Sequence, residues 1–113
     1  EYFLGSQLWK LDDNILTNYY YGHTHDMSDV ELKIKPKDDL IYIENTFKTK
    51  VLETTNDNQV ILEDFEEDKA EQLWKKGGPN NEGYFTLESS KLPKFMTGVS
   101  SIGLEIKGNI TLE

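Results

Sequence analysis

The tetrapeptide Gln-Leu-Trp-Lys occurs twice in this chain, at positions 7–10 and 72–75, and its two copies contain both tryptophans. Each copy is followed by a polar turn, an apolar segment, a loop and then a Leu-x-Ile-Lys segment, in the same order. Internal repetition of this kind indicates one supersecondary unit that packs against copies of itself. The alternative is coincidence between short matches in a chain rich in β-forming residues.

Short apolar runs separated by turn-forming residues dominate the rest of the chain. In the segment 30–35, Val30, Leu32 and Ile34 alternate with charged residues, which is the period of a strand with one wet face. Asn, Asp, Gly and Pro fill the breaks between runs. The pattern predicts an all-β fold of short strands, with a single helical turn at most within 66–76. Expected strands lie at 14–21, 29–35, 39–45, 49–54, 59–65, 83–89, 94–99 and 104–113.

Length and charge narrow the class of protein further. A chain of 113 residues with even composition predicts one domain over 1–113. The net charge is −9, and all 12 basic residues are lysine, so we expect no nucleic-acid partner. No apolar run is long enough for membrane insertion, and the absence of cysteine excludes disulfides. The chain begins at Glu1, which predicts a processed chain or a segment of a longer one.

The residues around the second tryptophan resemble the repeat of the ricin B-chain family of β-trefoils, most clearly over 40–89. Gln72-Leu73-Trp74 matches the family's Gln-x-Trp signature, and Gln7-Leu8-Trp9 matches it again. The segment 50–54 resembles the family's Leu-Asp-Val strand, with Glu53 in place of Asp, and the segment 20–27 resembles it with Asp26.

The resemblance implies a ricin B-like β-trefoil, with both tryptophans in equivalent core positions and both glutamines bonded to backbone. The chain departs from the family in two ways. It is short for three repeats, and the unit at about 15–41 has no Gln-x-Trp. The trefoil is therefore either trimmed, or the N-terminal segment completes the last unit by closing the circle. We favour closure.

The resemblance also implies sugar sites, in which an acid accepts hydroxyl hydrogen bonds and an aromatic ring stacks on the sugar. The better site centres on Asp26, with Tyr20, Tyr21 and His23 nearby. A second site would use Glu53 and Gln72, but it lacks an aromatic residue at 63 and is expected to be degenerate. In the alternative interpretation, Asp26 is a turn residue and the tyrosines fill core and surface.

The function predicted on this basis is a non-catalytic, lectin-like carbohydrate-binding module whose partner is a glycan or glycoprotein. The alternatives are a protein-binding trefoil, such as a protease inhibitor, a toxin or a complex subunit, and a structural subunit of an assembly or homo-oligomer. No catalytic motif is present, so we expect no enzyme and no cofactor. The sequon at 109–111 favours an extracellular or secreted location and leaves a cytoplasmic one open.

Two further clusters point to metal chemistry only weakly. His23 and His25 stand beside Asp26, yet a structural site needs four ligands and these are the only histidines. The acidic stretch 63–71 does not follow the spacing of a calcium loop. We therefore predict no metal site and interpret 63–71 as a solvated acidic turn; a weak calcium site or a basic partner is the alternative.

Overall fold

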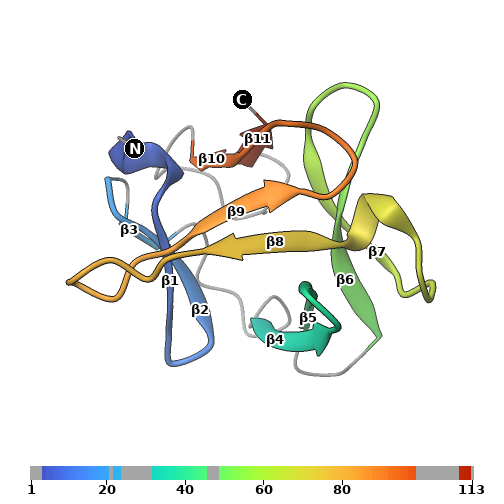
Figure 1. Cartoon of the computed structure of the whole chain (residues 1–113), viewed down its shortest axis with the longest axis horizontal. Coiled ribbons are helices and arrows are strands. Elements are labelled where there is room, and N and C mark those ends of the chain that lie inside the picture. Colours follow the sequence, from blue (N-terminus) through green and yellow to red (C-terminus); the bar gives the residue numbers. More distant parts are fainter. Residues whose placement is uncertain (1–3, 21, 24–31, 46–48, 99–109, 113) are drawn as a thin grey trace.

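The computed structural model describes residues 4–20, 22–23, 32–45, 49–98 and 110–112. The described residues form antiparallel strands and two short 3-10 turns, so the all-β prediction is confirmed (Figure 1). The helical turn expected within 66–76 is the second of these 3-10 turns. The elements are η1 (Gly5–Gln7), β1 (Trp9–Asp12), β2 (Ile15–Asn18), β3 (Gly22–His23), β4 (Leu32–Lys37), β5 (Leu40–Asn45), β6 (Lys50–Thr54), β7 (Val60–Asp64), η3 (Ala70–Gln72), β8 (Trp74–Gly77), β9 (Thr86–Ser89), β10 (Met96–Gly98) and β11 (Ile110–Leu112).

Three hairpins of one design form the centre of the molecule: β1–β2, β4–β5 and β8–β9. In each hairpin the first strand begins with a fully buried apolar residue, and a buried polar residue ends the second strand directly opposite it. Two of the hairpins turn on two residues, at 13–14 and 38–39, whereas the third carries the longer loop 78–85. The opposed pairs are Trp9 with Asn18, Leu32 with Asn45, and Trp74 with Ser89.

Each hairpin joins the next one through its first strand. In each contact, the buried apolar residue that begins one hairpin pairs with a residue of the neighbouring hairpin. That residue lies four positions before the buried polar residue that ends the neighbouring hairpin. The order β1-β2-β4-β5-β8-β9 therefore returns to β1, and the six strands surround one core. The three contacts are Trp74 with Ile41, Trp9 with Phe85, and the backbone N–H of Leu32 with the carbonyl of Asn14 at 2.6 Å.

Both tryptophans lie in this core and are fully buried, as the sequence predicts. The indole Nε1–H of Trp74 donates to the carbonyl of Leu52 in β6 at 3.2 Å, and that of Trp9 donates to the carbonyl of Met96 in β10 at 2.8 Å. β6 and β10 therefore occupy equivalent places, each above one hairpin and each paired with a following strand, β7 or β11.

The N-terminal copy of the motif completes the C-terminal unit. The turn η1 contacts β10 just as η3 contacts β6, so the order β10–β11–η1–β1 repeats the order β6–β7–η3–β8. Figure 1 shows η1 and the β10–β11 hairpin on the same side of the molecule. This arrangement is the circular closure that the sequence led us to favour. In the remaining unit, Leu32 fills the tryptophan position without an indole to bond.

The buried polar residues that end the hairpins hold the next turn in place. The side-chain oxygen of Asn18 accepts from the N–H of Tyr20 at 3.0 Å, and that of Asn45 accepts from the N–H groups of Thr49 and Lys50 at 3.0 and 3.2 Å. Ser89 does the same for the two turn residues that follow Ser90, at 3.1 and 3.3 Å. Buried polar groups need such partners, and these bonds supply them locally.

We predict that Trp74→Ala lowers the free energy of unfolding by about 3–5 kcal/mol, because it removes a fully buried ring and leaves a cavity in the shared core. Chemical denaturation followed by circular dichroism measures this loss. Tyr20→Ala serves as the control, since its ring is 70% exposed and the stability should change little. An unchanged midpoint for Trp74→Ala would contradict the core placement.

Candidate functional site

One cross-strand row of residues recurs on all three hairpins, and in the row on β8–β9 Lys75 is exposed while Glu88 and Phe95 are half-buried. The row begins at the lysine that directly follows the buried apolar residue of the first strand. Its second member is the residue opposite that lysine in the second strand, and its third member is the residue paired with the second one in the next strand. Residues directly opposite in antiparallel strands share a face and lie close together. The three rows are Lys75–Glu88–Phe95, Lys33–Glu44–Val51 and Lys10–Thr17–His23.

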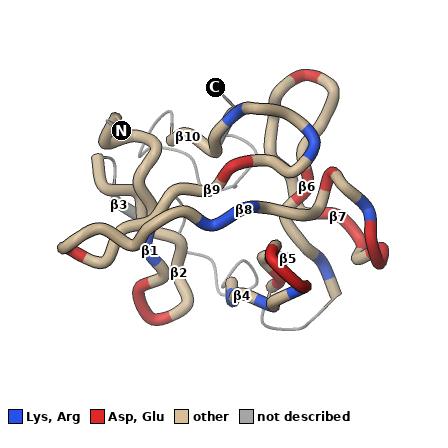
Figure 2. The backbone as a smooth tube through the Cα atoms, viewed as in Figure 1, with Lys and Arg blue, Asp and Glu red and all other residues tan. Residues whose placement is uncertain are grey.

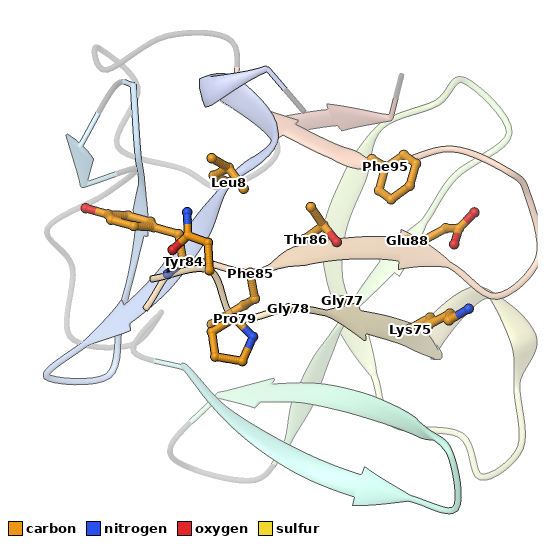
Figure 3. A pocket seen from close by; sticks show the side chains of 11 residues that line it. Leu8, Lys75, Gly77, Gly78, Pro79, Tyr84, Phe85, Thr86, Glu88 and Phe95 are labelled. Carbon is orange, nitrogen blue, oxygen red and sulfur yellow. Dashed lines mark hydrogen bonds between the residues drawn. The ribbon is translucent and has the colours of Figure 1, made fainter. Parts of the chain in front are cut away.

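The row on β8–β9 borders a hollow of about 390 Å³ (Figure 3). Lys75, Glu88 and Phe95 form one end of it, and Tyr84 with Pro79 of the 78–85 loop forms the other. The loop begins with a cis peptide bond before Pro79 and is held by the Asn80 side chain, which accepts from the N–H of Tyr84 at 2.9 Å.

Small residues create the floor of this hollow. Gly77 lies opposite Thr86, and a Cβ atom at Gly77 would stand 2.6 Å from the hydroxyl oxygen of Thr86. The corresponding places on the other hairpins hold larger side chains, so the hollow of this shape belongs to β8–β9. The larger pairs are Lys35 with Tyr42 and Asp12 with Ile15.

Rings and charges meet around the hollow in a defined arrangement. The Tyr84 ring packs edge-on against Tyr19, with centroids 5.0 Å apart, and the Lys10 ammonium lies 5.3 Å from the Tyr84 centroid. The lysine at the opposite end can donate hydrogen bonds and the glutamate can accept them. The site therefore combines an apolar ring face with a donor and an acceptor side by side.

The predicted pair Glu53 and Gln72 does come together, but as a structural clamp. The Gln72 side chain is fully buried, and its Nε2 donates to Glu53 Oε1 and to the carbonyl of Asp64, both at 2.8 Å. Its Oε1 accepts from the N–H of Glu66 at 2.9 Å. Both amide hydrogens are used within the protein, so this glutamine bonds to backbone as predicted and has no donor left for a ligand.

Two of the other predicted site residues, Tyr20 and His23, lie on the β2–β3 side of the molecule. Tyr20 follows β2 in a turn and is 70% exposed. His23 belongs to β3, where it pairs with Thr17. Asp26 and Tyr21 lie outside the described residues. His23 lies in the β1-β2-β3 sheet and Glu53 in the sheet that contains β6, so the two predicted sites are built on different sheets, and the relation of Tyr20 and His23 to Asp26 stays a prediction.

The acidic stretch 63–71 covers the β4–β5 hairpin and is tied down by lysines. The N–H of Asp68 donates to the Tyr42 hydroxyl at 2.9 Å, and the Phe65 ring packs edge-on against Tyr42 at 5.0 Å. Lys69 lies 2.9 Å from Glu66 and 3.1 Å from Glu53. The turn is thus largely exposed, as predicted, but four of its acids, Asp64, Glu66, Asp68 and Glu71, form ion pairs with lysines.

These ion pairs shift the ionisation of the groups involved. Hydrogen bonds to Glu66 and Glu53 raise the pKa of Lys69, and the Lys91 ammonium lowers the pKa of Glu71. The Glu71 pair therefore contributes stability above the ordinary carboxyl pKa and loses it as the pH falls through the lowered pKa. The Lys69 pair is fully present below the ordinary lysine pKa and is lost only as the pH rises beyond it.

No protein family and no curated protein matches this chain. Among solved structures, it is similar to a chain in the crystal structure of the Haemophilus ducreyi cytolethal distending toxin. The match has a TM-score of 0.63 and 14% sequence identity, and it covers 100% of this chain and 78% of that chain. Identity this low shows likeness of fold alone.

Two other searches of the described part of the chain gave negative results. It contains no group of three or more His, Cys, Asp or Glu residues that could hold a metal ion. None of its helical segments is long and apolar enough to cross a membrane.

Sequence reasoning missed the hollow on β8–β9. Its signal is the segment 75–80, where two glycines and a proline follow the second Gln-Leu-Trp in place of the tight polar turn that follows the first. A longer loop and a missing side chain at Gly77 are what open a hollow at this hairpin and not at the hairpin after Trp9.

We predict that Gln72→Glu lowers the free energy of unfolding by about 1–3 kcal/mol at pH 7, because the new carboxyl faces Glu53 and the Asp64 carbonyl without donors. Burial and the neighbouring carboxylate raise the pKa of the new group in the folded state. The deficit should therefore shrink as the pH falls through that raised pKa and be smallest near and below about 4, where the group becomes protonated in both states.

Urea denaturation at pH 7 and pH 4 measures this effect. Glu67→Gln is the matched control, since Glu67 is exposed on the same acidic stretch. Equal stability of Gln72→Glu and the wild type at pH 7 would show that the clamp contributes nothing.

Proposed function

We propose that this chain is a non-catalytic carbohydrate-binding module with a β-trefoil fold of the ricin B-like type. The fold proposal is supported by three equivalent hairpins that form a ring of six strands, and by two further hairpins, β6–β7 and β10–β11, that lie over it. The equivalent tryptophan bonds to Leu52 and Met96 give the same support.

The observation that carries the binding proposal is the Lys75–Glu88–Phe95 row at the edge of the hollow. A sugar offers vicinal hydroxyls on its rim and C–H groups on its face. One hydroxyl can donate to the Glu88 carboxylate while its neighbour accepts from the Lys75 ammonium. The rings at the two ends of the hollow can pack against the C–H face.

The charges of this site favour a neutral glycan. Lys75 and Glu88 are directly opposite each other, so their charges offset locally. Figure 2 shows this pairing as a blue segment on β8 beside a red one on β9. A neutral saccharide gains hydrogen bonds from both groups without leaving a charge unpaired. A glycan partner is consistent with an extracellular or secreted location, which is part of the proposal.

A protein-binding subunit is the second candidate. Leu4, Tyr19 and Tyr20 are 59%, 47% and 70% exposed, and exposed tyrosines are enriched at protein interfaces. The similar solved structure is a toxin by its description, and at 14% identity that likeness concerns the fold alone.

We predict that the protein binds a neutral saccharide in a glycan-array screen, and that Glu88→Gln and Phe95→Ala each weaken that binding by about tenfold. The first removes the charged acceptor and the second removes a ring face, and a tenfold loss corresponds to one such contact. Isothermal titration with the array hit measures the change.

Glu82→Gln is the control for Glu88→Gln, because Glu82 is an exposed acid on the neighbouring loop. Binding that survives Glu88→Gln but disappears in Asp26→Ala would move the site to Asp26. A folded protein that binds no glycan on the array would contradict the proposed function and favour the protein-binding candidate.

A further inference from the structure

We propose that this chain has an oxyanion site, which takes a sulfate or phosphate group in a second hollow. This hollow lies between the β6–β7 turn, η3 and the loop that joins β9 to β10, and its volume is about 260 Å³. Its walls come from the segment 54–58, from Glu71 and from the segment 91–94. It shares no lining residue with the β8–β9 hollow, so the inference does not depend on the saccharide proposal.

Hydrogen bonds between the three segments hold the walls of this hollow in place. The backbone N–H of Ser90 donates to the carbonyl of Leu73 at 3.0 Å, and its hydroxyl donates to the carbonyl of Ala70 at 2.7 Å. At the other end of the loop, Lys94 Nζ donates to Asn58 Oδ1 at 3.2 Å. The hollow is therefore built before a ligand binds, which lowers the entropic cost of binding.

Two lysines make this hollow positive in a protein whose net charge is −9. Among the lining residues, Lys91 and Lys94 stand against a single acid, Glu71. The Lys91 ammonium is paired with the Glu71 carboxylate, whereas the Lys94 ammonium is bonded to the neutral amide of Asn58. Figure 2 shows the blue segments of this loop beside the β6–β7 hairpin. Each ammonium carries three donors, so both keep hydrogens for an anion.

A buried hydroxyl at the same hollow lacks a partner in the described part of the chain. Thr54 lines the hollow and is only 4% exposed, and its side chain makes no hydrogen bond with the described residues. Burying a hydroxyl without a partner costs free energy, and native proteins seldom leave one in that state. An oxygen of a bound anion would accept the Thr54 hydrogen.

The neighbouring hydroxyl is also left as a donor. The Thr55 Oγ1 accepts from the N–H groups of Asp57 and Gln59 at 3.3 and 3.2 Å. A hydroxyl has two lone pairs and one hydrogen, so only the hydrogen of Thr55 remains. Two ammonium groups and two hydroxyls therefore offer donors around one small space. A sulfate or phosphate group matches them, because it presents several acceptor oxygens and a negative charge.

The test is an NMR titration of the ¹⁵N-labelled protein at low ionic strength with sulfate, phosphate, methyl sulfate and methyl phosphate. We expect saturable amide shifts in the segments 54–58 and 91–94 and at Glu71, and none with chloride at equal ionic strength. Binding of the methyl esters as well as the inorganic ions would assign the site to an esterified group. Binding of the inorganic ions alone would assign it to the free ion, and either result supports the site.

Variants of the lining residues test the donor set. Lys94→Gln and Thr54→Val should each weaken anion binding by about tenfold, because each removes one hydrogen bond to a charged ligand. Glu71→Gln should strengthen binding about threefold, because it releases the Lys91 ammonium from its ion pair. Lys50→Gln is the control, since Lys50 is an exposed lysine of β6 that does not line the hollow.

Thr54→Val distinguishes a ligand-binding hydroxyl from a structural one. A buried hydroxyl without a partner does not stabilise the fold, so the urea midpoint of the free protein should stay equal or rise while the anion affinity falls. A lowered midpoint with unchanged affinity would overturn the role of Thr54. No shift with any of the four anions, or shifts that persist undiminished in both Thr54→Val and Lys94→Gln, would overturn the oxyanion site and leave the saccharide proposal standing.

Discussion

The bond from a buried indole N–H to a backbone carbonyl of a covering strand is the interaction on which the rest of this structure depends. A fully buried indole must find an acceptor, and each tryptophan finds one in β6 or β10. That single bond fixes the height of the covering hairpin above the central ring. It thereby fixes which carbonyl faces inward and which side chains of the covering strands face out.

The cross-strand rows follow from this arrangement. Once the Trp9 indole is bonded to the Met96 carbonyl, the residue before Met96 lies beside Glu88, which is why Phe95 reaches the edge of the hollow. The same geometry in the β4–β5 unit places the buried Val51 beside Glu44.

The core could be predicted from the sequence because the same residue types recur at two of its equivalent positions. Gln-Leu-Trp-Lys marked both buried rings, and the backbone bonding of Gln72 was anticipated. The role of Leu32 could not be predicted. A leucine in an alternating strand gives no sequence signal that it occupies the position equivalent to the tryptophans and not some other inward position. The β8–β9 hollow was missed for another reason: it depends on the space left by Gly77 beside Thr86 and on the path of a long loop. Both are properties of three-dimensional packing.

The bond between Trp9 and Met96 joins residues 87 positions apart. Closing so large a loop costs chain entropy before any contact compensates for it, and folds dominated by such distant pairs form slowly. On the ribosome, the first Gln-Leu-Trp-Lys segment would emerge long before its covering strand, while β6 to β9 could assemble among themselves. The contacts of the middle unit can therefore form before the first tryptophan meets its covering strand.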